Sequence, residues 1–496
     1  MTQKYILSLD EGTSSARAAL YNHDGHRVQL AGLEFESQYP QPGWVEQDAE
    51  KVWQLQLDVA RQTLAKGKVK AEDIAAIGIT NQRETLVVWD RKTGQPIAPA
   101  IVWQCRRTSA ECQALNEGPD RDWIMERTGL VIDPYFTGTK LQWLLDHTPG
   151  ARERAEGGDL LFGNIDTWLI WKLTGGRVHV TDYTNASRTL LMNLATGQWD
   201  DDLLRVFQIP RAILPKIAKS SEVVASTDAS IFGAEIPIAG IAGDQQAATA
   251  GQACFAPPMI KNTYGTGCFC LLHTGNKLVR SRHRLITTRA ASTTDEAQFA
   301  IEGSVFVAGA VVQWLRDSLR IIPDAPSSQQ IAESVPDSAG VYFVPAFVGL
   351  GAPHWDSGAR GVISGLTRGA TAAHIVRAAL ESIAFQSREL VDAQRADAGL
   401  PIDEMRVDGG AANNDFLMQF QADILDCRIV RPADTETTAL GAAYLAGLAV
   451  GYWKSTEEIA GFWKSDKVFE PRICASERDR LYSGWRDAIA RASSQQ

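Results

Sequence analysis

The sequence contains no cysteine pattern of the kind that builds a disulfide framework or a zinc site. Its seven cysteines are odd in number and scattered, and none forms a Cys-x-x-Cys pair. Unpaired cysteines of this kind are typical of proteins kept in a reducing compartment. We therefore expect a cytoplasmic protein without structural disulfides or zinc.

No apolar run is long enough to cross a membrane. The longest weakly polar stretch, residues 439–453, is rich in Ala and Gly, and it is shorter than the ~20 residues that a membrane span needs. Residues 1–9 do not resemble a secretory leader, because they run directly into a polar turn. We expect no membrane span and interpret residues 439–453 as a closely packed, buried helix.

The chain has fewer basic than acidic residues, 49 Lys and Arg against 59 Asp and Glu, and its net charge is −10. This balance provides no net attraction to nucleic acid or anionic membranes, and we expect no nucleic-acid partner. The remaining composition, 45% hydrophobic and 22% charged, is that of a globular protein. Because single cores stop growing at ~250–300 residues, a chain of 496 residues predicts two or more domains.

A short polar turn between two apolar runs stands near the start of the chain. It reads Asp-Glu-Gly-Thr-Ser-Ser at residues 10–15, which predicts two strands joined by a tight loop. The glycine allows close approach of a ligand, and the hydroxyl and N–H groups suit phosphate oxygens. Asp10 could hold a cation that neutralises those phosphates. An ordinary Gly-Ser hairpin turn is the alternative interpretation.

Strands alternating with helical stretches predict α/β domains. We expect a helix capped by Asp48, strands at residues 74–80 and 236–241, a helix over residues 303–319 and a long helix after Thr371. Polar groups follow several of the strands. Ligands of α/β domains collect at such strand ends.

The second half of the chain repeats the first polar turn. Residues 262–269 read Asn-Thr-Tyr-Gly-Thr-Gly-Cys-Phe, and Thr266 lies about half the chain length after Thr13. Residues 405–414 read as a strand, a glycine loop and a helix start. We predict a duplicated α/β domain, residues 1–252 and 253–496, with one turn from each half facing a shared cleft.

Two longer motifs extend this pattern. Residues 135–147 read Tyr-Phe-Thr-Gly-Thr-Lys-Leu-Gln-Trp-Leu-Leu-Asp-His, and residues 361–369 read Gly-Val-Ile-Ser-Gly-Leu-Thr-Arg-Gly. With the two turns and the Gly409-Gly410 loop, they resemble the FGGY family of carbohydrate kinases nearly end to end. The resemblance implies the actin/hexokinase/Hsp70 ATPase fold, in which two RNase H-like domains close over ATP and substrate. Within the family the chain is similar to members that act on glycerol.

Phosphoryl transfer needs neutralised phosphates, an in-line acceptor and removal of the acceptor's proton. The resemblance implies that Asp244 is the general base and that Asp10 and Asp244 hold Mg²⁺, partly through water. Judged by position alone, Asp244 is equally suited to cap the helix that follows it.

The resemblance also assigns binding residues. Those of the acceptor pocket are Arg83, Glu84, Trp103, Tyr135, Asp244, Gln245 and Phe269. Those of the nucleotide site are Thr13, Ser14, Ser15 and Thr266 at the phosphates, Arg17 near the terminal phosphates, and Gly309, Gln313, Gly410 and Asn414 around the adenosine. Without the resemblance, core packing explains Trp103 and Phe269, and a solvated loop pair explains Arg83 and Glu84. Gln313 then suits a helix surface, and Asn414 a helix cap.

The expected function is ATP-dependent phosphorylation of glycerol to sn-glycerol 3-phosphate, with Mg²⁺ as cofactor. A kinase of the same family acting on another polyol or a ketose, or a non-metabolic ATPase of the same fold, is the alternative. We also expect a homo-oligomer of two or four chains.

The chain departs from the family pattern at a few positions. Glu11 stands where relatives usually carry Gln, and an extra negative charge there should weaken nucleotide binding unless it points away or organises the metal. Residues 226–235 lack the basic, Gly-rich loop with which some relatives bind an inhibitory sugar bisphosphate, and no His lies between His179 and His273. We therefore expect neither that inhibition nor activation by histidine phosphorylation.

Overall fold

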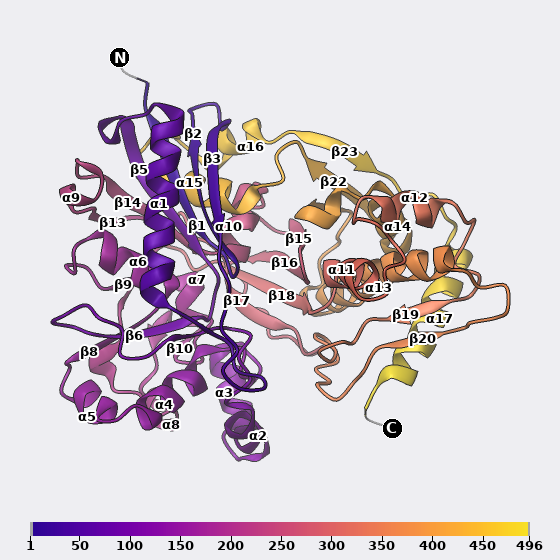
Figure 1. The fold of residues 1–496 in the computed structure, drawn as a ribbon, viewed down its shortest axis with the longest axis horizontal. Helices are drawn as coiled ribbons and strands as arrows, with labels where there is room; N and C mark the ends of the chain where they lie inside the picture. The colour runs from indigo at the N-terminus through magenta and orange to yellow at the C-terminus, as the bar shows by residue number, and fades with distance from the viewer. Residues whose placement is uncertain (1–2, 495–496) are drawn as a thin grey trace.

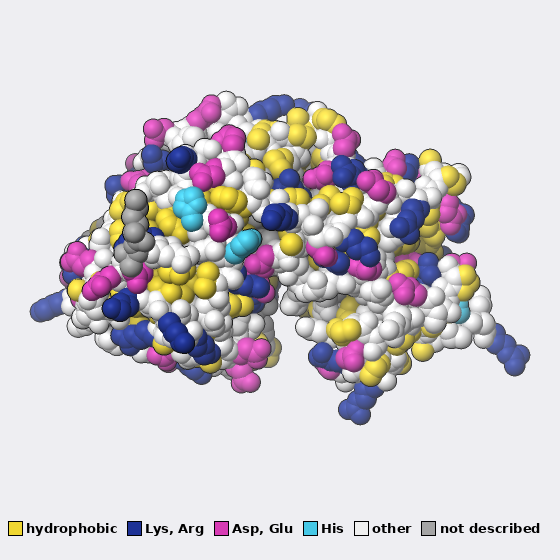
Figure 2. Space-filling model, turned by 90° about the horizontal axis from the view of Figure 1, so that it is seen from above, with side chains coloured by type: hydrophobic (Ala, Val, Ile, Leu, Met, Phe, Trp, Pro, Cys, Tyr) yellow, Lys and Arg dark blue, Asp and Glu magenta, His cyan; other side chains and the backbone are white. Residues whose placement is uncertain are grey.

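The computed structural model describes residues 3–494 as two lobes with a cleft between them. Residues 1–2 and 495–496, the ends of the two predicted domains, lie outside the described part. The first half of the chain forms one lobe and most of the second half forms the other (Figure 1). A notch separates the two lobes in the space-filling view (Figure 2).

The first lobe is built on a six-stranded sheet of order β13-β14-β5-β1-β2-β3. Its strands are β1 (Tyr5–Glu11), β2 (Ser15–Tyr21), β3 (Arg27–Glu34), β5 (Ile74–Asn81), β13 (Ser221–Ser226) and β14 (Pro237–Gly243). β1 to β3 form an antiparallel meander, whereas β5 pairs parallel to β1, and β14 pairs parallel to β5. Glu11 and Gly243 both pair with Asn81, so the three parallel strands end at one edge.

The second lobe repeats this plan in a seven-stranded sheet of order β17-β18-β16-β15-β21-β22-β23. Its strands are β15 (Ile260–Tyr264), β16 (Cys268–Gly275), β17 (Ile286–Arg289), β18 (Phe299–Val305), β21 (Glu404–Asp408), β22 (Arg428–Pro432) and β23 (Ser465–Phe469). The hairpin β15–β16 corresponds to β1–β2, and the parallel strands β21 and β22 correspond to β5 and β14. The predicted duplicated α/β fold is confirmed, with β17 as an additional edge strand.

Smaller sheets and helices complete the lobes. The small sheets contain β4 (Glu46–Gln47), β6 (Leu86–Asp90), β7 (Ala100–Ile101), β8 (Leu160–Asn164), β9 (Val180–Asp182), β10 (Met192–Asn193), β11 (Gln198–Trp199), β12 (Lys216–Ala218), β19 (Tyr342–Val344) and β20 (Val362–Ser364). The helices that cover the sheets and lobe ends include α2 (Ser109–Glu117), α3 (Arg121–Thr128), α4 (Thr137–His147), α5 (Ala151–Glu156), α6 (Ile165–Leu173), α7 (Tyr183–Ala186), α8 (Asp201–Val206), α9 (Ala229–Phe232), α12 (Ser327–Glu333), α14 (Asp415–Leu425), α16 (Thr456–Phe462) and α17 (Ala475–Ala492).

Helix α1 (Ala49–Gly67) begins where the sequence predicts it. The Asp48 carboxylate accepts hydrogen bonds from the backbone N–H groups of Glu50 and Lys51. A cap of this kind stabilises a helix by about 0.5–2 kcal/mol. The face that carries Val52, Trp53 and other apolar side chains is buried in the core of the first lobe. The predicted long helix is α13 (Ala372–Ala398), which follows Thr371 in a capping box.

Helix α15 (Thr437–Ala449) follows β22 of the second sheet but packs against the first. Its Ala and Tyr side chains form a shared core with Ile6, Ala76 and Ala239 of that sheet. It also contacts α10 (Asp244–Gly251) closely, since a Cβ atom on Gly441 would lie 1.7 Å from the carbonyl oxygen of Ala247. The prediction of a closely packed, buried helix is confirmed as far as Ala449, where the helix ends, and residues 450–453 lie outside it. Within residues 3–494, no helix combines the length and apolarity that crossing a bilayer requires.

The predicted helix over residues 303–319 is wrong in its first part. Gly303 to Val305 belong to β18 and pair with Cys270 and Cys268 of β16. The helix, α11, spans only Gly309–Asp317. Pairing with a strand some 35 residues earlier in the chain decides this segment, and local periodicity carries no information about such a partner.

Candidate active site

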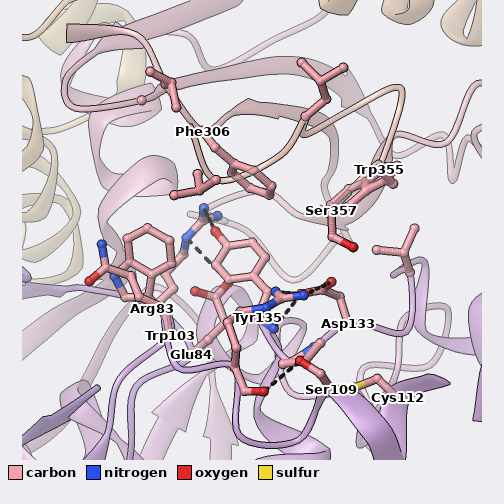
Figure 3. Close-up of a pocket in the computed structure, with 18 of the residues that line it drawn as sticks. Arg83, Glu84, Trp103, Ser109, Cys112, Asp133, Tyr135, Phe306, Trp355 and Ser357 are labelled. Carbon is pink, nitrogen blue, oxygen red and sulfur yellow. Dashed lines mark hydrogen bonds and ion pairs between the residues drawn. The ribbon is translucent and has the colours of Figure 1, made fainter. Parts of the chain in front are cut away.

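The cleft between the lobes has a volume of about 1890 Å³, more than the ~300–1,000 Å³ of a pocket for one small molecule. Arg83, Glu84, Trp103 and Tyr135 lie on one wall, and Phe306, Trp355 and Ser357 of the second lobe lie on the other (Figure 3). The cavity therefore has room for more than one substrate.

Both polar turns predicted from the sequence lie at this cavity. The first joins β1 to β2, with the Gly12 N–H donating to the Ser15 carbonyl oxygen over 2.9 Å, and Thr13 and Ser14 line the cleft. The second joins β15 to β16 and presents Thr266 and Gly267 to the same cavity. Two equivalent hairpin turns, one from each lobe, thus face a single space.

Arg83 and Glu84 form the polar floor of the cleft. Both side chains are only 2% exposed, which rules out a solvated loop pair. They lie directly after β5, at the edge where the parallel strands of the first sheet end. Glu84 has a positive φ of 62°, a conformation that is uncommon for residues other than glycine.

Aromatic rings border this floor. Trp103 and Phe269 both line the cleft and are half-buried, and Trp103 also packs against the core of the first lobe. The Trp103 ring contacts Tyr135 edge-on, with 5.5 Å between centroids. The Tyr135 hydroxyl lies 3.4 Å from Nη2 of Arg83. The arrangement combines charged groups below with apolar ring surface at the sides.

Asp244 is the first residue of α10, and its N-cap is Gly243. The alternative interpretation, in which Asp244 is the N-cap of this helix, is therefore not what the structure contains, because Asp244 already lies inside the first turn. Oδ1 lies 3.2 Å from Nε of Arg83 and accepts a hydrogen bond from the Gln245 N–H. Both contacts recorded among the described residues use Oδ1, which leaves Oδ2 available to accept a substrate proton.

Gln245 is oriented by a lysine that the sequence analysis did not single out. The fully buried Lys261 ammonium donates 2.6 Å to Oε1 of Gln245 and 2.8 Å to the Thr263 hydroxyl. Burial lowers the pKa of Lys261, although Asp408 and Asp244 oppose this effect. Because Oε1 accepts from Lys261, the amide NH₂ of Gln245 is left as the group that can donate to a ligand.

Asp10 is the last but one residue of β1, next to the first polar turn, and it pairs with Arg17 of β2 in the backbone register. Burial raises the pKa of Asp10 to about 7, with Arg17 opposing and Glu436 and Asp244 adding to the rise. Arg17 itself forms a 2.6 Å ion pair with Glu436, a residue of the second half of the chain.

Glu11 is fully buried, and neither carboxylate oxygen has a hydrogen-bond partner among the described residues. Burial first, and the neighbouring Asp10 second, raise the pKa of Glu11 well above its ordinary value. The direction of this shift favours the protonated, neutral form of Glu11, which would add no negative charge beside the first polar turn.

The predicted adenosine residues are not among the residues that line the cavity. The Gly309 N–H donates to the Gly265 carbonyl oxygen over 2.9 Å, which leaves no space for a side chain at this position. Gln313 is exposed on α11. Gly410 begins a short 3-10 helix, and Asn414 caps α14 through the Leu417 N–H. Gln313 and Asn414 thus occupy the helix-surface and cap positions that local patterns predict.

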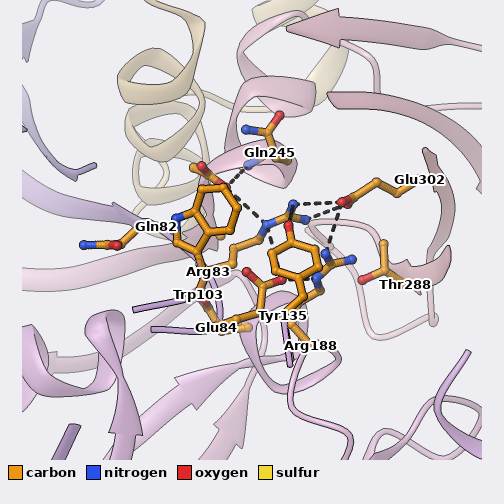
Figure 4. A network of polar contacts seen from close by, with 12 residues as sticks. Gln82, Arg83, Glu84, Trp103, Tyr135, Arg188, Gln245, Thr288 and Glu302 are labelled. Atoms are coloured by element: carbon orange, nitrogen blue, oxygen red, sulfur yellow. Dashed lines mark hydrogen bonds and ion pairs between the residues drawn. The ribbon is translucent and has the colours of Figure 1, made fainter. Parts of the chain in front are cut away.

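Two further buried charged residues of the site, besides Lys261, were missed by the sequence analysis. Arg188 contacts Glu84, and Glu302 contacts both Arg83 and Arg188 (Figure 4). Glu302 carried a local signal, because it is the one charge in the buried strand Phe299–Val305. Arg188 carried none, since it lies in a polar loop after α7.

The residues present fit a magnesium ion held largely by water. No group of three or more His, Cys, Asp or Glu suited to a metal occurs within residues 3–494. Mg²⁺ retains several waters and commonly uses one or two carboxylates together with substrate phosphates. Asp10 and Asp244 supply such carboxylates, and a cation would offset the burial that raises the pKa of Asp10.

The fold and the site define a two-domain α/β carbohydrate kinase architecture. The N-terminal domain of the FGGY family of carbohydrate kinases matches residues 5–251, and its C-terminal domain matches residues 260–450. The chain belongs to this family.

Three proteins are similar to this chain over nearly its whole length. Glycerol kinase 2 of Thermotoga maritima is 57% identical over 489 residues, which cover 99% of both chains. The crystal structure of Plasmodium falciparum glycerol kinase with ADP superposes with a TM-score of 0.93 at 37% identity, covering 100% of this chain and 99% of that one. Gluconate kinase from Lactobacillus acidophilus superposes with a TM-score of 0.89 at 25% identity, with 100% of each chain covered.

Proposed function

We propose that the protein transfers the γ-phosphoryl group of ATP to glycerol and releases sn-glycerol 3-phosphate and ADP. The observation that carries this proposal is the juxtaposition of Arg83, Glu84 and Asp244 at the cleft floor, between the two phosphate-type turns. The high identity to a glycerol kinase over almost the whole chain supports the same substrate.

Three kinds of side chain would bind the small triol. Arg83 donates to one hydroxyl, and Glu84 accepts from another. Trp103 and Phe269 cover the carbon backbone, and Tyr135 and Gln245 complete the pocket. A short polyol that is polar at each carbon and apolar on its C–H faces matches such a floor and walls.

The acceptor proton would move to Asp244. Oδ1 is engaged by Arg83 and by the Gln245 N–H, so Oδ2 receives the proton as the new bond to phosphorus forms. A positioned carboxylate contributes about 10²–10⁴-fold in this role. Bound at Asp10 and Asp244, Mg²⁺ would neutralise charge on the phosphates.

The nucleotide would lie across both turns. Thr13, Ser14 and Ser15 of the first lobe and Thr266 of the second donate to phosphate oxygens, and Arg17 reaches the terminal phosphates after leaving Glu436. Gly309, Gln313, Gly410 and Asn414 would surround the adenosine. At Gly410 no atom lies within 4 Å of the place where a Cβ atom would stand, so the nucleoside could approach the backbone closely there.

ADP release measured with a panel of acceptors tests the proposal. We expect the highest kcat/KM for glycerol, with erythritol, xylulose and gluconate far behind. Turnover with xylulose or gluconate but not with glycerol would overturn the substrate assignment, and the fold similarity to gluconate kinase makes that comparison necessary. ATP hydrolysis that no polyol changes would favour a non-metabolic ATPase.

We further propose that the enzyme is cytoplasmic and that two or four copies of the chain assemble. Within each chain, we propose that residues 1–252 and 253–496 form the two domains. Light scattering of the purified protein measures the assembly. A monomeric mass at working concentration would contradict it.

A further inference from the structure

Four charged side chains form a buried network beneath the cleft floor. Arg83, Glu84, Arg188 and Glu302 are each at most 2% exposed. Glu302 lies on β18 of the second sheet, whereas the other three come from the first half of the chain. The network therefore spans the two lobes. Nothing in the reaction proposed above requires Glu302 or Arg188 to touch a substrate.

Glu302 engages one particular edge of the Arg83 guanidinium. Its Oε2 lies 2.6 Å from Nη1, and its Oε1 lies 2.9 Å from Nη2. These two bonds form the paired, planar contact that Arg makes with a carboxylate. The remaining Nη1 proton donates to Oε1 of Gln246 over 3.1 Å.

The neighbouring edge of the guanidinium, formed by Nε and Nη2, is the one that faces the cleft. There Nε lies 3.2 Å from Oδ1 of Asp244, and Nη2 lies 3.4 Å from the Tyr135 hydroxyl. Asp244 and Tyr135 both line the cavity. Because the guanidinium is planar and rigid, fixing one edge also fixes the direction of the other.

Arg188 links Glu302 to Glu84, the carboxylate that accepts from glycerol in the proposed function. Its Nε donates to Oε1 of Glu84, and its Nη2 donates 3.1 Å to Oε1 of Glu302. Burial would raise the pKa of Glu302, but Arg188 and Arg83 lower it to about 2. Glu302 is therefore an anion that receives both arginines.

We propose that Glu302, supported by Arg188, is a positioning residue that aims the donor edge of Arg83 at the polyol from the opposite lobe. This inference rests on the function proposed above. If Glu302 has this role, glycerol recognition depends on contact between the lobes. The Glu302 carboxylate belongs to the second lobe, and the Arg83 guanidinium that it holds belongs to the first.

The test uses Glu302→Gln and Glu302→Asp in the full-length protein. Glu302→Gln loses the anion, and Glu302→Asp keeps the charge but is one methylene too short to reach both Nη atoms. A charged hydrogen bond is typically worth enough to change affinity about tenfold. We expect both variants to raise the glycerol KM at least about tenfold, with the ATP KM within about twofold of wild type.

Acceptor analogues test whether the effect passes through Arg83. Propane-1,2-diol and propane-1,3-diol each lack one hydroxyl of glycerol. When Arg83 is correctly aimed, removing the hydroxyl that it binds lowers kcat/KM strongly. In both variants the ratio of kcat/KM for glycerol to kcat/KM for one of the two diols should become smaller. A general loss of stability would not change this ratio for one diol alone.

Glu381→Gln is the matched control, because Glu381 is a 3% exposed carboxylate that pairs with Arg377 at 2.8 Å away from the cleft. It should leave both KM values unchanged. The inference is overturned if wild type phosphorylates glycerol and Glu302→Asp keeps the wild-type glycerol KM, or if both substrates lose affinity equally. Wild type without glycerol turnover would instead refute the proposed function.

Discussion

The indole N–H of Trp103 donates a 2.9 Å hydrogen bond to the hydroxyl of Thr13. One residue belongs to the proposed polyol wall and the other to the first phosphate turn. The bond occupies a lone pair of the Thr13 hydroxyl and so fixes the direction in which its own proton can point. The two substrate sites are therefore in direct contact through a pair of side chains.

Replacement of Trp103 by Phe should raise the ATP KM by about fivefold, the value of one neutral hydrogen bond. The glycerol KM should change less, because a Phe ring still covers apolar surface. Steady-state kinetics with both substrates varied measure this. Trp199→Phe is the control, since Trp199 donates an equivalent 2.8 Å bond to the Pro215 carbonyl oxygen outside the cleft. A change in the glycerol KM without a change in the ATP KM would mean that Trp103 only covers the polyol and does not act through Thr13.

Replacement of Asp244 by Asn should lower kcat by about 10²–10⁴-fold. Asn retains an Oδ1 that can accept from Arg83 and from the Gln245 N–H, so glycerol should still bind with an affinity close to that of wild type. Coupled kinetics and titration calorimetry measure the two quantities. Asp133→Asn, in the cleft wall and paired with Arg106, is the control and should retain turnover. Retained turnover in Asp244→Asn would remove the residue from the base role.

Replacement of Glu11 by Gln should change stability in a pH-dependent way. The folded-state pKa of Glu11 lies well above its ordinary value of 4.5, so above pH 4.5 the folded state holds a proton that the unfolded state releases, and stability falls as pH rises. Glu11→Gln removes this dependence. Calorimetric unfolding should show a stability advantage for the variant at pH 8 that shrinks toward pH 4.5.

At pH 7 the same variant should keep an ATP KM close to that of wild type, because a protonated carboxyl group and an amide are both neutral. Glu34→Gln, at an exposed position of β3, is the control for both measurements. A large improvement in ATP affinity at pH 7 would show that Glu11 is ionised beside the phosphate turn.

Replacement of Glu436 by Gln should strengthen nucleotide binding. Without nucleotide, the Glu436 carboxylate holds Arg17 at 2.6 Å and competes with the phosphates for the guanidinium. We expect a several-fold lower Kd for ADP by titration calorimetry. Asp434→Asn is a near neighbour with a comparable ion pair, 3.4 Å from Arg27, and should have no such effect. Weaker ADP binding in Glu436→Gln would mean that Glu436 helps to organise the site.

Local signals were sufficient for much of the fold. Both hairpin turns, the cap at Asp48 and the long helix after Thr371 depend on neighbouring residues, and the structure contains each of them. The strand at Gly303 to Val305 was misassigned because its partner, β16, lies far away in the chain. Asp244 was placed correctly at a helix start, but the cap proved to be Gly243.

The amino-acid sequence thus determined which chemical groups the protein contains. It also determined where the turns and helix starts lie, because turn geometry and helix capping act over a few residues. The folded arrangement determined which of those groups meet. Glu302 and Arg83 are separated by most of the first domain in sequence, yet they lie 2.6 Å apart. Burial, which raises the pKa of Glu11 and leaves its oxygens without partners, likewise depends on side chains that come together only on folding. Long-range packing sets both the local dielectric environment and the identity of charge partners, and neither is encoded in a short stretch of sequence.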